Sequence, residues 1–326
     1  MSNGMSEEER RESKRRALDD FVKDLNEGPD LRINNSIVTF TSLASSDNLR
    51  QHYENRKMNT WGDAAGWIKD LVGKLSDMTP DPALAGLGAL AIAVLIDMLC
   101  PPDESIKDTL QCVFAEEKAS EVWDQIDECL KRCRMHINNN SELKNDIKRI
   151  ECQLSAALTK LKNSMVRDGH VSSQALKAWV NGAAFHIQML IHLVRLRGIQ
   201  TCDPVERLLS DYLANLDLLF KKHKEMIKGK CSKKVYWEIE TENLVVLVIA
   251  LFGGTSYYTQ YHYWVDEDSK WSLIKCGFEG EYDKYFEVYY DHRYERQKCE
   301  IQQYFRDIKQ NLQMLVHQRG SFNVNR

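Results

Sequence analysis

The chain has 326 residues, of which 43% are hydrophobic and 28% are charged, and its formal net charge is −4 at pH 7. This composition predicts a globular protein with a sizeable core, and the net negative charge argues against a nucleic-acid partner. Because the nine cysteines lack paired spacing and the N-terminus, MSNGMSEEERRESKRR, has no apolar signal segment, we expect a cytoplasmic protein with reduced thiols and no signal peptide.

The first part of the chain, residues 1–56, is expected to be a charged N-terminal helix and a linker. Residues 6–27 carry a narrow apolar stripe and end at Gly28-Pro29, which predicts an amphipathic helix. Residues 31–60 show no single pattern, and Ile33, Ile37, Val38 and Phe40 are compatible with a short extended piece. A polar helix that reaches Tyr53 should follow it.

The segment Ala83–Leu99 is the most apolar helix pattern in the chain. Its fourteen residues from Ala83 to Ile96 have no polar side chain, and a single Asp97 interrupts it near its end. A helix that is apolar on all sides must be enclosed by other helices or by lipid. Fourteen residues are too few for a comfortable membrane span. We therefore predict the buried central helix of a bundle, preceded by a helix over 59–75.

Four long amphipathic helices follow, and their apolar residues recur at spacings of three and four. They are predicted over residues 103–137, 143–165, 172–197 and 203–227, and the second of them approaches a coiled-coil stripe. Short links between long helices indicate antiparallel neighbours. We expect an all-α fold in which residues 57–240 form a bundle of long antiparallel amphipathic helices around the central apolar helix.

The remaining residues, 241–326, are expected to form a less regular, aromatic-rich part that ends in an amphipathic helix over 301–316. No charged residue occurs between Asn243 and Val265. One interpretation is a helix, which the context favours over 240–252, and the other is a hairpin of strands 244–252 and 257–265 around a glycine loop. Both interpretations remain open from the sequence.

Charge is distributed asymmetrically around this uncharged segment. Seven lysines lie between residues 221 and 234, and Asp266-Glu267-Asp268 lies beyond the segment. This asymmetry is expected of a membrane-entering segment whose lysine side stays cytoplasmic, and 23 residues would span as a helix. The alternative is a buried segment next to lysines that favour a helix C-terminus. The candidate membrane-contacting residues are Lys221, Lys222, Lys224, Lys228, Lys230, Lys233, Lys234, Leu244, Phe252, Tyr257 and Trp264.

Motifs of catalysis do not emerge from the sequence. Cys129 and Cys133 lie one helical turn apart near His136, but zinc sites need about four converging ligands. We expect buried free thiols here. His186 and His192 lie six positions apart on one helix and should face different directions as ordinary bundle histidines. We predict no catalytic, cofactor or metal site and hence no enzyme.

The layout resembles the rapunzel proteins of fish and the related cephalotoxin-like group. The resemblance lies in the apolar run Ala83–Ile96, the long helices from Ile106 to Ile227 and the sequence from Phe252 to Thr259, and it covers about residues 60–265. It implies a bundle like those of α-type pore-forming toxins, in which amphipathic helices enclose a hydrophobic one. No functional residue is carried over, because the resemblance includes no motif with assigned roles.

Together these observations predict a non-enzymatic helical bundle that interacts with membranes, in the manner of a pore-forming toxin. The expected partner is an anionic membrane surface, with self-association or protein partners as further expectations. The alternative is a soluble cytosolic helical protein-interaction module. In that alternative the apolar helix stays permanently in the core.

Overall fold

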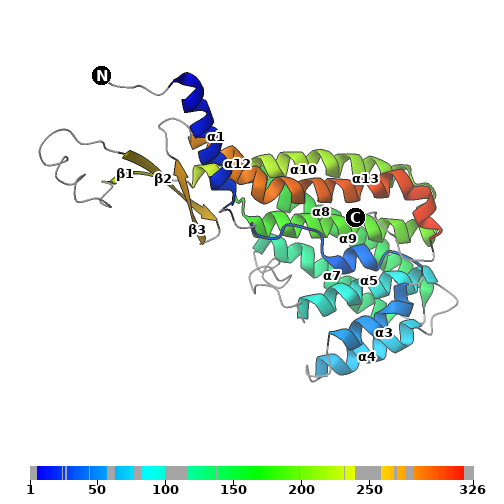
Figure 1. Ribbon diagram of the computed structural model, residues 1–326. Coiled ribbons are helices and arrows are strands. Elements are labelled where there is room, and N and C mark those ends of the chain that lie inside the picture. The colour runs from blue at the N-terminus through cyan, green and yellow to red at the C-terminus, as the bar shows by residue number, and fades with distance from the viewer. Residues whose placement is uncertain are drawn as a thin grey trace, which may run out of the picture. The chain divides into compact units, whose positions relative to one another are not determined.

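The computed structural model describes residues 6–23, 25, 28–43, 45–56, 63–76, 82–99, 117–136, 139–197, 199–230, 232–238, 258–267, 270–276 and 282–318. Helices dominate this part of the chain (Figure 1), which confirms the predicted helical-bundle fold. The chain divides into two compact units. One, called here the small unit, contains Met1–Pro29 and Lys224–Arg296, and the other, the bundle unit, contains Asp30–His223 and Gln297–Arg326.

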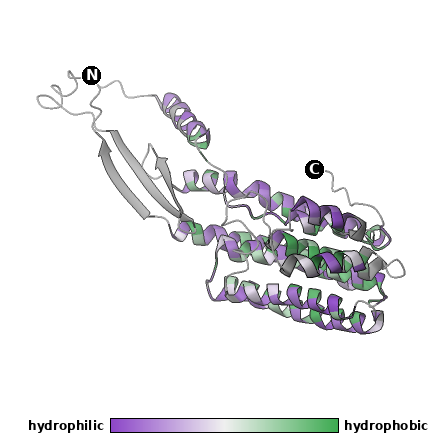
Figure 2. Ribbon diagram, turned by 90° about the horizontal axis from the view of Figure 1, so that it is seen from below, coloured by the Kyte–Doolittle hydropathy of each residue, from purple (hydrophilic) through white to green (hydrophobic). Residues whose placement is uncertain are grey.

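The bundle unit consists of helices in successive layers, with α10 beside α13, then α8 and α9, then α7 and α5, then α3 and α4 (Figure 1). Figure 2 shows polar and apolar faces on the same helices, as their amphipathic sequences require. The helices are α2 (Asn35–Thr39), α3 (Ser45–Asn55), α4 (Asp63–Ser76), α5 (Pro82–Leu99), α7 (Glu117–Met135), α8 (Asn140–Arg167), α9 (Ser173–Arg195), α10 (Asp203–Gly229, which continues into the small unit) and α13 (Arg296–Val316).

Local signals place the ends of the long helices. The side chain of Asn139 accepts a hydrogen bond from the backbone of Glu142 at the start of α8, and Ser172 does the same for Ala175 at the start of α9. Gly169 has a φ of 76° in the link between these two helices, a conformation that glycine adopts without strain. The predicted helices over 143–165, 172–197, 203–227 and 301–316 are confirmed.

The central helix α5 is enclosed as predicted. Every residue from Ala85 to Asp97 is buried, and α5 packs against α2, α3, α4, α7 and α9. Its glycines permit this close packing. A Cβ atom on Gly86 would lie 2.8 Å from the carbonyl oxygen of Ser42 and 2.8 Å from His192 Cε1, and one on Gly88 would lie 2.8 Å from Leu75 Cδ2.

Gly86→Ala is expected to destabilise the protein by about 2 kcal/mol, because the added methyl group meets a backbone oxygen that cannot move aside. The matched control is Gly73→Ala on α4, where a Cβ atom would meet nothing within 4 Å. Alanine has the higher helix propensity, so this control should be neutral or stabilising by about 0.5 kcal/mol. Urea unfolding measures both, and equal midpoints for the two variants would contradict the packing.

Two segments of the bundle unit differ from the expectation based on sequence or are described only in part. The short extended piece with which the sequence of 33–40 is compatible does not form, because residues 35–39 form helix α2. The Asn34 side chain caps this helix by accepting a hydrogen bond from Ser36 N, and Ile37 lies in the core. The long helix predicted from residue 103 is observed as α7 over its C-terminal part, and residues 100–116 lie outside the described residues.

The small unit contains α1 (Glu7–Lys23), α12 (Tyr282–Tyr290), the π-helical turn η3 (Asp291–Glu295) and a three-stranded antiparallel sheet. The sheet has the order β1-β2-β3, with β1 at Ser232–Glu238, β2 at Tyr258–Glu267 and β3 at Lys270–Cys276. In its register Val235 lies opposite Tyr261, and Tyr263 lies opposite Ile274.

The sheet decides part of the open question about the uncharged segment. Residues 258–265 lie in β2, so a helix that continues to Val265 is wrong, and the aromatic and β-branched composition of this stretch explains the strand. The second strand of the alternative hairpin is thus observed, although the strand paired with it on the N-terminal side is β1. The helix predicted over 240–252 lies outside the described residues.

Candidate functional site

Helix α9 buries polar side chains together with its apolar ones. The sequence predicted one inward face, whereas nearly all residues from Ser173 to Leu193 are buried. Its buried polar residues are Ser173, Lys177, Asn181, His186, Gln188 and His192. Buried polar groups cost free energy unless they are hydrogen-bonded, so the partners of these side chains define the candidate sites.

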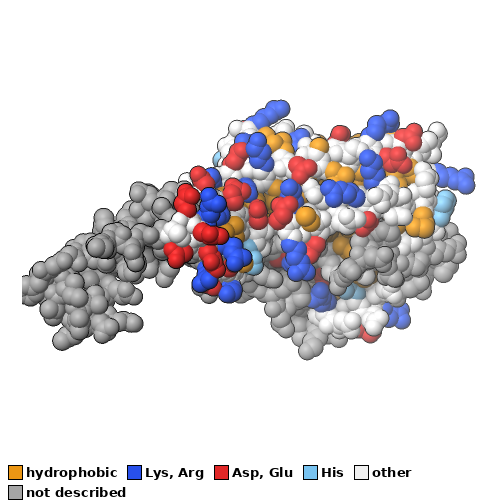
Figure 3. All heavy atoms as spheres, turned by 45° about the horizontal axis from the view of Figure 1, so that its top comes forward, with side chains coloured by type: hydrophobic (Ala, Val, Ile, Leu, Met, Phe, Trp, Pro, Cys, Tyr) orange, Lys and Arg blue, Asp and Glu red, His pale blue; other side chains and the backbone are white. Residues whose placement is uncertain are grey.

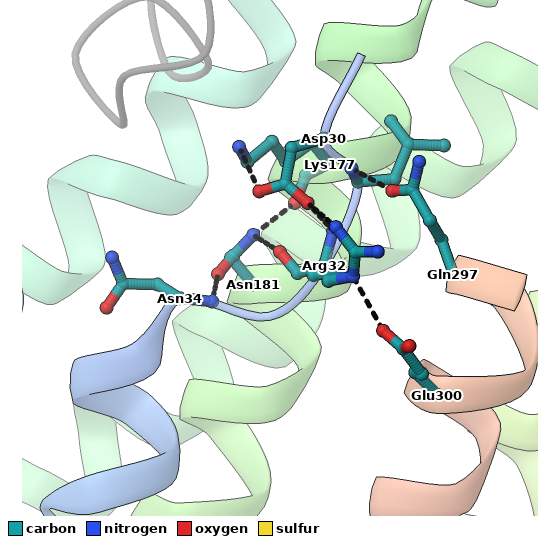
Figure 4. Close-up of polar contacts among 8 residues, drawn as sticks. Asp30, Arg32, Asn34, Lys177, Asn181, Gln297 and Glu300 are labelled. Atoms are coloured by element: carbon teal, nitrogen blue, oxygen red, sulfur yellow. Dashed lines mark hydrogen bonds and ion pairs between the residues drawn. The ribbon is translucent and has the colours of Figure 1, made fainter. Parts of the chain in front are cut away.

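Two side-chain amides hold a non-helical segment, residues 30–34, which we call the strap (Figure 4). Gln297 of α13 accepts a hydrogen bond from Leu31 N at 2.6 Å. Asn181 of α9 contacts the strap twice, because its Oδ1 accepts from Asn34 N at 2.7 Å and its Nδ2 donates to Arg32 O at 3.4 Å. Three backbone groups of the strap are therefore satisfied by helical side chains.

Charged side chains complete this contact (Figure 4). Lys177 Nζ, whose side chain is only 7% exposed, lies 3.2 Å from Asp30 Oδ2. Arg32 Nε lies 2.6 Å from Glu300 Oε2 and its guanidinium also contacts Asp30. Burial alone would lower the pKa of Arg32, but Glu300 and Asp30 raise it. We call Lys177, Asn181, Gln297 and Glu300 the strap site.

A second buried cluster joins α8, α9 and α10. His186 Nε2 lies 2.8 Å from Glu151 Oε1, and His186 Nδ1 lies 2.6 Å from the hydroxyl of Tyr212. Burial would raise the pKa of Glu151, but the hydrogen bond and charge of His186 lower it. Burial and the nearby charge of Glu151 raise the pKa of Tyr212, which keeps its hydroxyl neutral. This arrangement fixes three helices to one another.

A third cluster, which we call the latch, ties α5 to α2 and α3. Asp97, only 2% exposed, accepts a hydrogen bond from Ser36 Oγ at 2.5 Å and lies 3.0 Å from Arg56 NH2 and 3.3 Å from His52 Nε2. Burial alone would raise the pKa of Asp97. The close contact and charge of His52, the hydrogen bond from Ser36 and the charge of Arg56 bring it below its ordinary value of 3.8.

Two of the predicted membrane-contacting lysines are engaged within the small unit. Lys224 Nζ lies 2.5 Å from Glu287 Oε2 and 3.2 Å from Asp291 Oδ1, and Lys228 Nζ lies 2.6 Å from Asp283 Oδ1. We call these three acids the acidic stripe. Figure 3 shows acidic and basic side chains intermingled over the face in view. The acidic stripe therefore neutralises part of the basic cluster that the sequence suggested.

The other candidates are distributed as follows. Lys221 and Lys230 are exposed on or just after α10, and Lys222 is half-buried there. Lys233 and Lys234 lie on β1, opposite the end of β2 that carries Trp264. Leu244, Phe252 and Tyr257 lie outside the described residues. Within the part of the chain that the structure describes, no helix has the length and apolarity needed to cross a membrane.

The cysteines singled out in the sequence lie in the core. Cys129 and Cys133 are buried as free thiols, and the pKa of Cys129 is raised by its hydrogen bond to Cys133 and by burial. His136 lies 3.5 Å from Asp146 at the link between α7 and α8. Among the described residues, no three histidine, cysteine or acidic side chains converge as metal ligands.

Comparison with known proteins gives no match to any family model, curated protein or solved structure.

Proposed function

We propose that the chain is a non-enzymatic helical bundle that acts on anionic membranes by releasing α5 from its neighbours. The observation that carries the proposal is the complete enclosure of an apolar helix. Residues 85–97 of α5 are buried beneath amphipathic helices, and Asp97 is the only charged residue among them. Opening of the bundle would offer all faces of α5 to lipid, which is the one other environment that accepts such a helix.

Electrostatics would bring the bundle to the membrane. Each lysine near an anionic surface contributes about 1 kcal/mol of attraction. The acidic stripe competes for Lys224 and Lys228, so release of these two lysines strengthens the attraction. The acidic stripe is half to three-quarters exposed, which makes its own ion pairs weak and easily exchanged for lipid headgroups.

The test is release of a trapped dye from vesicles of phosphatidylserine and phosphatidylcholine, together with binding measured by sedimentation. We expect release from these vesicles, none from phosphatidylcholine alone, and loss of binding at high salt. The variant Asp283→Asn/Glu287→Gln/Asp291→Asn should bind about tenfold more tightly, because two lysines are freed and three negative charges are removed.

The matched control is Glu54→Gln/Asp168→Asn/Asp211→Asn, which removes the same charge from exposed positions of the bundle unit. If both triple variants gain equally, net charge and not the acidic stripe is responsible. If the wild type and both variants neither bind these vesicles nor release dye from them, the membrane proposal is contradicted.

A second function, a soluble protein-interaction module, is favoured by the latch. The buried carboxylate of Asp97 has partners on α2, on α3 and just after α3, and separating it from these partners costs free energy. This function predicts that α5 never contacts lipid. It also predicts unchanged stability in the presence of anionic vesicles.

A further inference from the structure

The strap site has the features of a surface that recognises an extended peptide. The side chains of Gln297 and Asn181 are buried, and both are used to satisfy backbone groups of residues 31–34. Asn181 brackets one strap residue, since it donates to the carbonyl before Ile33 and accepts from the amide after it. Hydrogen bonds of this kind bind the backbone of an extended peptide, and other contacts determine which side chains fit.

The selecting groups around the strap are complementary to three side chains in a row. Lys177 faces the acid of the strap, and Glu300 faces its arginine. Between these two charges Leu31 is 0% exposed, so it serves as the apolar anchor. At protein interfaces a buried anchor supplies much of the binding energy, and complementary charges supply specificity.

We propose that the strap site is a peptide-binding site, occupied in this structure by the chain's own residues 30–34. Its ligand class is an extended peptide with an acidic residue, a leucine and a basic residue in succession. If the strap leaves, Gln297 loses its bond with Leu31 N and Lys177 loses its contact with Asp30. Asn181 loses both bonds to the strap and keeps the one that its Nδ2 donates to Lys177 O. A peptide of the same pattern restores those partners, which is why we infer displacement by a peptide in trans.

The tethered strap competes with any such peptide. A segment joined to its site by a short link acts at an effective concentration in the millimolar range. The wild-type chain should therefore bind a free peptide weakly, and a chain with a weakened strap should bind it at least tenfold more tightly. The ratio of the peptide's affinities for these two chains measures how strongly the strap competes for the strap site.

The experiment uses the full chain and a fluorescent peptide, GPDLRINNS, which copies residues 28–36. Binding is followed by anisotropy to Leu31→Ala, in which the strap has lost its anchor, and to the wild type. The control peptide exchanges the aspartate and the arginine. If Leu31→Ala does not fold by circular dichroism, Arg32→Ala replaces it, because this side chain is 37% exposed and its loss leaves the core intact.

We expect saturable binding of the copied peptide to the weakened chain, at least tenfold weaker binding to the wild type, and loss of binding on the further change Asn181→Leu. The copied peptide should also raise the melting temperature of the weakened chain. The proposal is overturned if the copied peptide shows no saturable binding to the weakened chain at peptide concentrations up to about 1 mM. Equal binding of the charge-exchanged peptide also overturns it.

Discussion

Gly88→Asp is expected to abolish cooperative folding of the purified protein. The position lies in the enclosed stretch of α5, and a Cβ atom there would already lie 2.8 Å from Leu75 Cδ2. Leu75 can shift a methyl group, but the three atoms nearest to the added Cβ all belong to this apolar side chain, which offers the charge no partner. An unpaired buried carboxylate together with overpacking costs about 5 kcal/mol or more, which is comparable with the whole stability of a domain.

The matched control is Gly66→Asp on α4, an exposed position where a Cβ atom would meet nothing within 4 Å. It should change stability by less than about 0.5 kcal/mol. Circular dichroism during heating distinguishes the two. A cooperative transition of Gly88→Asp near that of the wild type would mean that α5 is not enclosed as described.

Arg56→Met is the second substitution with a large expected effect. It leaves the nearly fully buried carboxylate of Asp97 with His52 and Ser36 but without its guanidinium partner. Removing one partner of a buried ion pair costs about 3 kcal/mol, although the 24% exposure of Arg56 lowers this estimate toward about 2 kcal/mol. Asp97→Asn should cost less, because the amide leaves no buried negative charge.

The latch also makes stability depend on pH. The pKa of Asp97 in the folded protein lies below its ordinary value of 3.8, so the latch stabilises the fold above this pH. That contribution is lost as the pH falls through the folded-state pKa. Urea unfolding at pH 7, 5 and 3 should show a loss between pH 5 and 3 that is smaller in Arg56→Met and Asp97→Asn. An equal loss in all three proteins would contradict the role of the latch.

Sequence periodicity predicted most of the bundle because it depends on local chemistry. The apolar composition of residues 83–96 requires enclosure whatever the neighbours are, and the cap at Ser172 and the glycine at 169 define helix ends within a few residues. The apolar stripe of α13, which includes Ile301, Phe305 and Leu312, is buried as its spacing predicts.

The candidate sites were less predictable because they join residues far apart in the chain. Asn181 and Gln297 contact strap residues that lie 147 and 266 positions away in the sequence, respectively. No local sequence pattern predicts contacts over such separations. A signal did exist in α9, where Ser173, Lys177 and Asn181 recur every four residues in the N-terminal half of the helix. Polar residues at that spacing indicate a second buried face with dedicated partners.

Misjudged elements have similar causes. Residues 35–39 are β-branched-rich, but the cap at Asn34 and the burial of Ile37 favour a helix over the local propensity. The engagement of Lys224 and Lys228 by the acidic stripe depends on α12, which lies more than fifty residues later in the chain. Charge counting along the sequence therefore overestimates the basic cluster.

Contact between α5 and lipid can be measured by cross-linking the wild-type chain to a lipid whose acyl chain carries a diazirine. The labelled peptides are mapped by mass spectrometry after illumination on anionic and on neutral vesicles. We expect label within residues 85–97 of α5 on phosphatidylserine-containing vesicles and none there on phosphatidylcholine. Binding or dye release without label in residues 85–97 would contradict the proposed release of α5.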